Sequence, residues 1–228
     1  MDYLQLVNRA RQEGGVSGAA LLSLGGTVSQ ETQRFKAWVN EAWRELQIHC
    51  KDWDFMRSDF EFDTTAAVQT YTAASLSTPL TSFRNWKRDT FRAYTTSIGF
   101  GDEQILRFEP WESFRNLYLY GNQRSTTGRP VLFSIKPDKS LVIGPVPDAV
   151  YTINGEYFRQ ATDLVGDTDE PGITDEYHML LVWRALRAYG LYESAAEVVV
   201  RADGEIKRLM SKIENDQMPE VTSGPPLA

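Results

Sequence analysis

The chain has 228 residues and a formal net charge of −7, from 24 Lys and Arg against 31 Asp and Glu. Hydrophobic residues make up 42% of it, which is enough for a folded core and excludes a wholly disordered chain. Cys50 is the only cysteine, which excludes an intrachain disulfide, and neither a signal peptide nor an apolar run of the roughly 20 residues needed to span a membrane is present.

Two helices are expected in the first fifty residues. Residues 2–12 have the spacing of a short amphipathic helix, and residues 13–26, rich in Gly, Ser and Ala, indicate a loop. A stronger helix is predicted over about 28–50, with Thr27 or Ser29 as its cap. Its apolar residues recur at helical spacing: Phe35, Trp38, Val39, Ala42, Trp43 and Leu46.

The middle of the chain, 58–160, has the alternation of strands. Phe60 and Phe62 alternate with acidic residues, which predicts a strand with one buried face. A short helix is expected over 110–120. Residues 131–157 predict a β-meander, in which a Lys-Pro-Asp-Lys turn joins two short strands and a third alternating stretch follows.

The last third predicts two more helices, over 175–189 and up to about 215. Ser194 and Glu197 have the spacing of a capping box before the second helix. The loop between the two is short, so an antiparallel helical hairpin is expected.

Together these elements predict an α+β chain that is mainly α. Residues 1–57 and 161–217 are expected to form one helical bundle from the N-terminal helices and the C-terminal hairpin. Residues 58–160 are expected to be a β-rich insertion, and 218–228 an extended tail.

No recognisable catalytic or metal-binding motif occurs. His49, Cys50 and His178 lack the spacing of a zinc site, and no phosphate-binding loop or nucleophile elbow is present. The acidic stretch 167–172 resembles the start of a calcium loop, but Pro171 occupies a ligand position. We therefore predict no catalytic, metal or cofactor-binding residues and no enzymatic activity; a hydrolase using a carboxylate pair is the alternative.

Residues 83–92 interleave aromatic and basic side chains. Such a segment can stack on bases and neutralise phosphates. It can equally be strand structure with its aromatic rings inward and its Arg stems outward. The net negative charge of the chain favours the second interpretation.

Several stretches of the sequence resemble the phage adaptor proteins of tailed phages, and more distantly tail tubular protein A. They are Phe-Ser-Ile-Lys-Pro-Asp-Lys-Ser-Leu at 133–141, Gly-Pro-Val-Pro-Asp at 144–148 and Tyr-Thr-Ile-Asn-Gly-Glu-Tyr at 151–157. The stretch Ile-Thr-Asp-Glu-Tyr-His-Met-Leu-Leu-Val-Trp-Arg-Ala-Leu at 173–186 and the charged helix that follows it are similar too.

The resemblance implies a structural head–tail adaptor, or connector, of the virion neck. Such a protein forms a ring, typically a dodecamer, that docks below the portal protein, contacts a downstream tail or neck protein and lets genomic DNA pass during ejection without sequence-specific binding. It implies synthesis and assembly in the host cytoplasm, with no membrane and no cofactor. A stopper or tail terminator is the alternative within the same junction.

Two sets of interface residues follow. By position in the family, the C-terminal segment is expected to reach a neighbour or the portal through Met218, Pro219, Glu220, Val221, Pro225, Pro226 and Leu227. The apolar stripes of the last two helices are expected to pack between subunits through Trp183, Val198, Ile206, Leu209 and Ile213.

Overall fold

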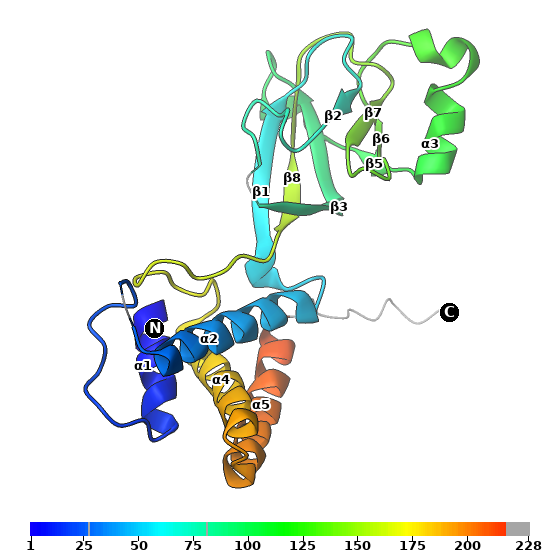
Figure 1. Cartoon of the computed structure of the whole chain (residues 1–228). Helices are drawn as coiled ribbons and strands as arrows, with labels where there is room; N and C mark the ends of the chain where they lie inside the picture. The colour runs from blue at the N-terminus through cyan, green and yellow to red at the C-terminus, as the bar shows by residue number, and fades with distance from the viewer. Residues whose placement is uncertain (27, 81, 218–228) are drawn as a thin grey trace, which may run out of the picture. The chain divides into compact units, whose positions relative to one another are not determined.

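The computed structural model describes residues 1–26, 28–80 and 82–217, and the chain forms two compact units (Figure 1). The first unit joins Met1–Met56 to the residues from Ala161 onward, and the second is Arg57–Gln160. We call them the helical unit and the β unit.

The helical unit is built around α4 (His178–Tyr192). This helix packs against α1 (Tyr3–Glu13), α2 (Gln30–His49) and α5 (Ala196–Gln217). Because it is surrounded, α4 is apolar on most of its circumference, with Leu180, Leu181, Val182, Ala185 and Leu186 all buried. Two short 3-10 helices, Asp54–Met56 and Asp175–Tyr177, complete the unit.

The helices begin where their sequences supply caps. The Asp2 carboxylate accepts from the Gln5 backbone amide, and the Gln5 side-chain oxygen accepts from the Asp2 backbone amide, which makes a capping box at the start of α1. Ser29 caps α2 by accepting from the Thr32 amide at 3.2 Å. Ser29 is thus the cap of α2, whereas Thr27 lies outside the described residues.

Amide side chains of the helices hold two irregular segments of the helical unit. Asn8 pairs with both the amide and the carbonyl of Leu21, at 2.8 and 2.9 Å. Asn40 does the same for Leu164, at 2.9 Å in each direction, and Gln47 for Thr162, at 3.0 and 2.9 Å. Each side-chain amide donates to a backbone carbonyl and accepts from the backbone amide of the same residue, as a neighbouring strand would. Backbone that has no regular structure is therefore still hydrogen-bonded.

The β unit contains two four-stranded sheets. One has the order β1-β8-β3-β4, with β1 (Arg57–Asp63), β8 (Tyr151–Arg159), β3 (Phe83–Thr95) and β4 (Gln104–Ile105). The other has the order β2-β7-β6-β5, with β2 (Thr70–Tyr71), β7 (Leu141–Gly144), β6 (Leu132–Ile135) and β5 (Arg107–Phe108). Helix α3 (Trp111–Tyr118) and the 3-10 helices Phe100–Asp102 and Gly121–Ser125 lie between strands.

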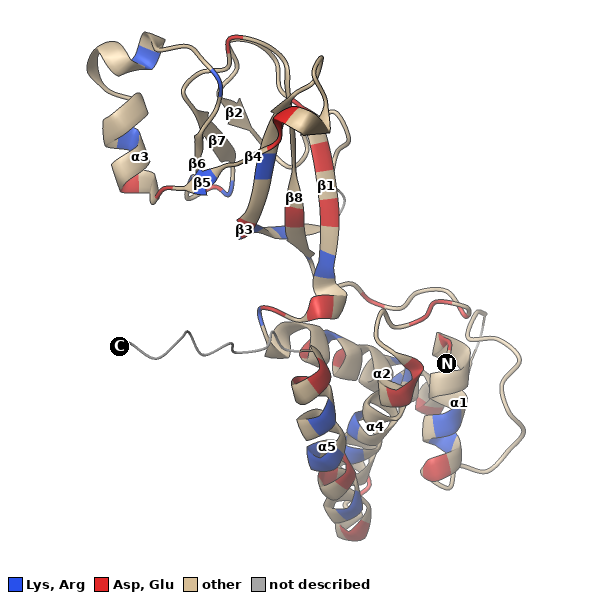
Figure 2. Ribbon diagram, turned by 180° about the vertical axis from the view of Figure 1, so that it is seen from behind, with Lys and Arg blue, Asp and Glu red and all other residues tan. Residues whose placement is uncertain are grey.

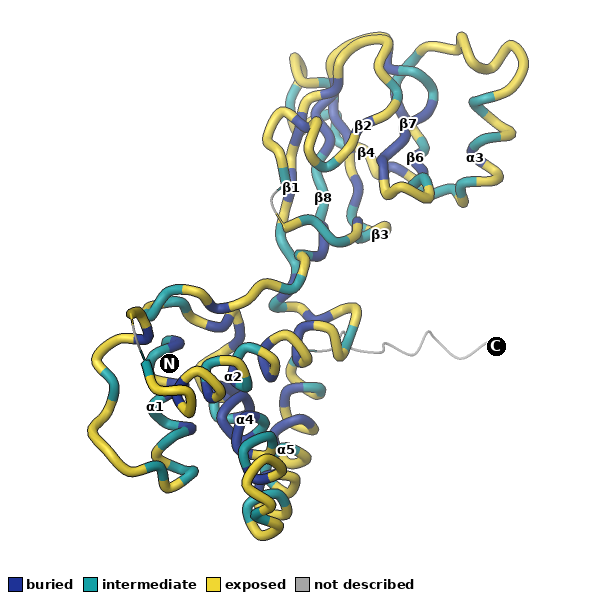
Figure 3. The backbone as a smooth tube through the Cα atoms, in the orientation of Figure 1, coloured by how far each residue is buried: buried dark blue, intermediate teal, exposed yellow. Residues whose placement is uncertain are grey.

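The core of the β unit is dominated by aromatic rings from both sheets. Phe91 of β3 stacks on Phe133 of β6 with ring centroids 4.1 Å apart, and both are fully buried. Phe60 of β1 packs on Trp86 and on Phe91 at 4.9 and 5.1 Å. Figure 3 shows buried residues along these strands and along α4, so each unit has a core of its own.

Three predictions are corrected by these observations. The fold class, a mainly α chain built on a helical bundle and hairpin, is wrong, because the described residues form five α-helices and two four-stranded sheets. The β-meander is also wrong: β6 and β7 pair, but β8 joins the other sheet between β1 and β3. Ser194 does not cap α5, since its φ of 57° is left-handed rather than extended and the helix begins at Ala196.

Candidate docking surfaces

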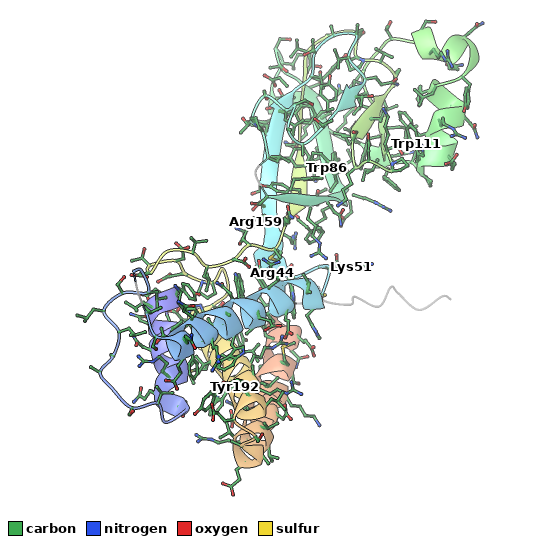
Figure 4. The ribbon with its side chains drawn as sticks, in the orientation of Figure 1. Arg44, Lys51, Trp86, Trp111, Arg159 and Tyr192 are labelled. Atoms are coloured by element: carbon green, nitrogen blue, oxygen red, sulfur yellow. The ribbon has the colours of Figure 1, made fainter. Side chains whose placement is uncertain are left out.

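The aromatic residues of segment 83–92 are packed inside the β unit. The whole segment lies in the single long strand β3, where Trp86 is 4% exposed and Phe91 is fully buried. The Trp86 indole donates to the carbonyl of Lys139 at 2.8 Å, and Figure 4 labels this ring within the β unit. These two rings are therefore unavailable for stacking on nucleic-acid bases, which supports the packed-strand interpretation.

The outward face of the β1-β8-β3-β4 sheet is highly charged. Asp59, Glu61 and Asp63 are exposed between the buried Phe60 and Phe62, and Figure 2 shows the acidic residues along β1. On the neighbouring strand, Glu156 accepts from Arg57 at 2.9 Å. An open groove of about 610 Å³ crosses this face, lined by Asp59, Phe60, Glu61, Asp89, Thr90, Arg92, Asn154, Gly155 and Glu156.

A loop at the end of β3 exposes an apolar patch. Ile98, Phe100 and Ile105 are 67%, 73% and 65% exposed. Val150 is 46% exposed and its carbonyl accepts from the Thr96 amide at 3.4 Å. We call these four residues the loop patch. Large exposed apolar side chains such as these are candidates for a protein–protein contact.

The loop patch is held in place by Asp102. Its carboxylate accepts from the Thr95 hydroxyl at 2.6 Å and from the Arg129 guanidinium at 2.6 Å. Both contacts favour the ionised form, and with the Thr95 amide they lower the pKa of Asp102 to about 2. The loop is thus anchored by charge while its apolar side chains point outward.

The helical unit has an aromatic cluster where α2 meets the end of α4. Trp38 lies 6.0 Å from Tyr192 between ring centroids, and the Arg34 guanidinium sits 4.2 Å above the Tyr192 ring. Tyr192 is 52% exposed and the neighbouring Leu191 58% (Figure 4 labels Tyr192). This is a second surface where an apolar contact is available.

The two histidines sit in structural contacts. His178 is 1% exposed, its Nε2 lies 3.1 Å from the Ile173 carbonyl, and its Nδ1 lies 2.6 Å from the Met1 amine. Burial, and then the positive amine, lower the pKa of His178. His49 contacts Glu214 at 3.1 Å. Within the described part of the chain no three His, Cys, Asp or Glu side chains are placed to hold a metal ion.

The residues predicted for subunit packing are mostly covered by their own chain. Ile213 is fully buried, and Leu209 and Trp183 are 6% and 9% exposed, whereas Val198 and Ile206 are half-buried. The predicted C-terminal interface lies outside the described residues: Met218, Pro219, Glu220, Val221, Pro225, Pro226 and Leu227.

Sequence reasoning missed the loop patch. Two of its residues, Ile98 and Phe100, alternate with the glycines at 99 and 101, a pattern that invites comparison with glycine-rich phosphate-binding loops rather than with an apolar surface. An Ile and a Phe next to glycines, with no periodicity around them, were the signal that could have indicated exposure.

Comparison with known proteins identifies the family of the chain. A family model described as SU10 adaptor protein matches residues 1–226. No curated protein matches the chain. None of the helices in residues 1–26, 28–80 and 82–217 has the length and apolar character to cross a membrane.

The match covers nearly the whole sequence, so the predicted resemblance to phage adaptor proteins is confirmed at the level of the family. The chain belongs to the SU10 adaptor protein family and is a structural phage adaptor, a component of the virion at the junction of head and tail.

Proposed function

We propose that this protein forms a ring, typically of twelve subunits, that docks below the portal, joins the capsid to the tail and lets genomic DNA pass through its centre. The observation that carries the proposal is the family match across residues 1–226. The subunit would be made and assembled in the host cytoplasm, where the free thiol of Cys50 stays reduced.

The exposed surfaces support a subunit with several neighbours. A ring subunit needs two lateral contacts and at least one contact along the ring axis. The loop patch of the β unit and the Trp38–Tyr192 cluster of the helical unit lie in different units, and each exposes large apolar side chains. One of these surfaces would meet the portal or the next protein of the neck.

The charge of the subunit supports passage of DNA without binding. Its net charge of −7 repels a polyanion, and β1 exposes three acidic residues, Asp59, Glu61 and Asp63. Trp86 and Phe91, which lie in the most basic aromatic segment, are buried. We therefore expect no measurable affinity for duplex DNA at physiological salt, which fluorescence anisotropy would check.

Assembly on the portal is the decisive test. We expect mass photometry to show a monomer or weak oligomer for the pure protein, and the added mass of a ring when it is mixed with the portal of the same phage. A variant that ends at residue 217 tests the predicted C-terminal contact, and circular dichroism controls its folding. A full-length chain that stays solitary in the presence of the portal would contradict the proposal.

A further inference from the structure

We propose that neighbouring copies of this protein meet head to tail, with the outer face of α5 of one copy against the acidic segment 163–176 of the next. We call the first surface the α5 face and define it as the exposed positions Glu197, Val200, Arg201, Gly204, Lys207, Arg208, Ser211, Lys212 and Asn215. The proposal rests on the ring function proposed above and names the lateral contact that would build the ring.

The α5 face points away from α4, and all of its positions are exposed. At 100° per residue its positions fall within one side of the helix, opposite Ala202, Leu209 and Ile213, which are buried toward α4. Although α5 as a whole has more acidic than basic residues, this face has four basic side chains and only Glu197 as an acidic one. Figure 2 marks the positions of basic residues along the α5 ribbon in blue.

Two lysines of the α5 face are available for a partner. Arg208 is paired with Glu205 at 2.7 Å, and Arg201 lies 3.7 Å from Glu13 and 5.0 Å from the centre of the Trp183 ring. Lys207 and Lys212 are exposed and have no ion pair within the described part of the chain. Their Nζ groups can therefore bind carboxylates of another copy without breaking an internal contact.

Gly204 lies in the middle of the α5 face. A glycine within a helix is unfavourable relative to alanine, so it calls for a reason. Nothing lies within 4 Å of the position where its Cβ would be, which excludes packing inside the subunit as that reason. The adjacent Val200 is 72% exposed. A gap beside an exposed apolar side chain fits the close approach of a second chain.

The acidic segment 163–176 provides the opposite charge. It contains six acidic residues and no Lys or Arg: Asp163, Asp167, Asp169, Glu170, Asp175 and Glu176. Most of these carboxylates form hydrogen bonds or ion pairs within the subunit. Asp163 binds Arg44, Asp167 binds Ser23, Asp169 accepts from backbone amides at 165 and 166, and Asp175 binds the Met1 amine.

Glu170 and Glu176 remain exposed and without an ion pair among the residues described. The segment as a whole is fixed against the helices, because Tyr3 donates its amide to the Asp169 carbonyl at 2.8 Å and Asn40 binds Leu164. The backbone of the acidic segment is therefore fixed, and the carboxylates of Glu170 and Glu176 can bind two cations of another copy.

The two surfaces lie on different elements of the helical unit. The α5 face belongs to a helix that packs on α4, whereas the acidic segment is tied to α1 and α2 (Figure 2). A symmetric dimer through either surface would bring like charges together. A head-to-tail contact instead pairs lysine with glutamate at every junction, which is the arrangement that repeats around a closed ring.

Charge reversal in two separate variants tests the contact. The first variant is Lys207→Glu/Lys212→Glu, and the second is Glu170→Lys/Glu176→Lys. Each should lose at least tenfold in ring formation on the portal, because like charges then meet at every junction. An equimolar mixture should recover rings, since opposite charges meet at every junction when the two variants alternate around the ring. Lys51→Glu/Arg107→Glu, with the same change in net charge as the first variant at exposed positions outside both surfaces, is its matched control.

Intersubunit cross-linking gives an independent readout. A carbodiimide couples lysine amines directly to carboxylates, and in rings built from mixed ¹⁴N- and ¹⁵N-labelled chains we expect Lys207 or Lys212 joined to Glu170 or Glu176 of a differently labelled chain. Folded variants that assemble like the wild type, or a mixture that fails to recover, would overturn the proposed contact alone. A wild-type chain that forms no ring on the portal would overturn the proposed function as well.

Discussion

The helical unit and the β unit are each stabilised by a different kind of internal contact. In the helical unit, long irregular segments are fixed by amide side chains that hydrogen-bond to the backbone, as Asn40 does with Leu164. In the β unit, two sheets are held by a cluster of aromatic rings, centred on the Phe91–Phe133 stack. The difference teaches that both units bury apolar side chains, but the helical unit adds geometry-sensitive polar contacts that fix its irregular segments.

The largest effect is expected from emptying the aromatic core. Phe91→Ala removes a fully buried ring and should cost about 3–5 kcal/mol of unfolding free energy in the β unit. Hydrogen exchange should show lost protection in Arg57–Gln160 while α4 stays protected, because each unit has its own core. Equal loss of protection in both units would show that the two units do not have independent cores.

Removing an amide contact should have a smaller effect, confined to the helical unit. Asn40→Ala leaves the amide and carbonyl of Leu164 without their partner and should cost about 1–3 kcal/mol, measured by urea unfolding. Gln33→Ala, at an exposed position of the same helix, is the control and should stay within about 0.5 kcal/mol of the wild type.

Replacing two glycines with alanine should change the free energy of unfolding in opposite directions. A Cβ at Gly144 would lie 2.8 Å from Tyr118 and 3.0 Å from Phe114, so Gly144→Ala should destabilise the β unit by about 1–3 kcal/mol. A Cβ at Gly204 meets nothing, so Gly204→Ala should stabilise the free subunit by about 0.5–1 kcal/mol. Thermal unfolding of both variants checks the pair, and a loss of stability in Gly204→Ala would show contacts inside the subunit.

The smallest effect concerns acid stability. The pKa of Asp102 falls from its ordinary 3.8 to about 2 in the folded protein. A lowered carboxyl pKa contributes stability that is present above pH 3.8 and is lost as the pH falls through about 2. Asp102→Asn should therefore flatten the fall in the urea midpoint between pH 4 and pH 2. An unchanged slope would show that Thr95 and Arg129 do not favour the ionised form.

The sequence predicted local elements better than their assembly. Helical spacing indicated a helix over 28–50, close to the observed Gln30–His49, and the Lys-Pro-Asp-Lys turn correctly joined β6 to β7. The predicted fold class was wrong because periodicity shows which side of an element is buried but does not show which other element packs on that side. Nothing in the residues of β8 shows that it pairs with β1 and β3 rather than with β7.

The candidate surfaces were harder still to predict. The stripe around Leu209 and Ile213 indicated an apolar contact, but not that α4 of the same chain would cover it. The loop patch depends on Asp102 meeting Arg129, which is 27 residues away in sequence. Contacts between distant residues that have no periodic pattern can be seen only once the chain is folded.

The pairing of β1 with β8 has a consequence for how such proteins diversify. Arg57 stands opposite Phe158, so the chain enters and leaves the β unit on two adjacent strands. A module whose two ends lie side by side can be exchanged for another with the same spacing between ends, without changing the path of the host chain. The two units can thus be inherited separately, because replacing one leaves the fold of the other unchanged.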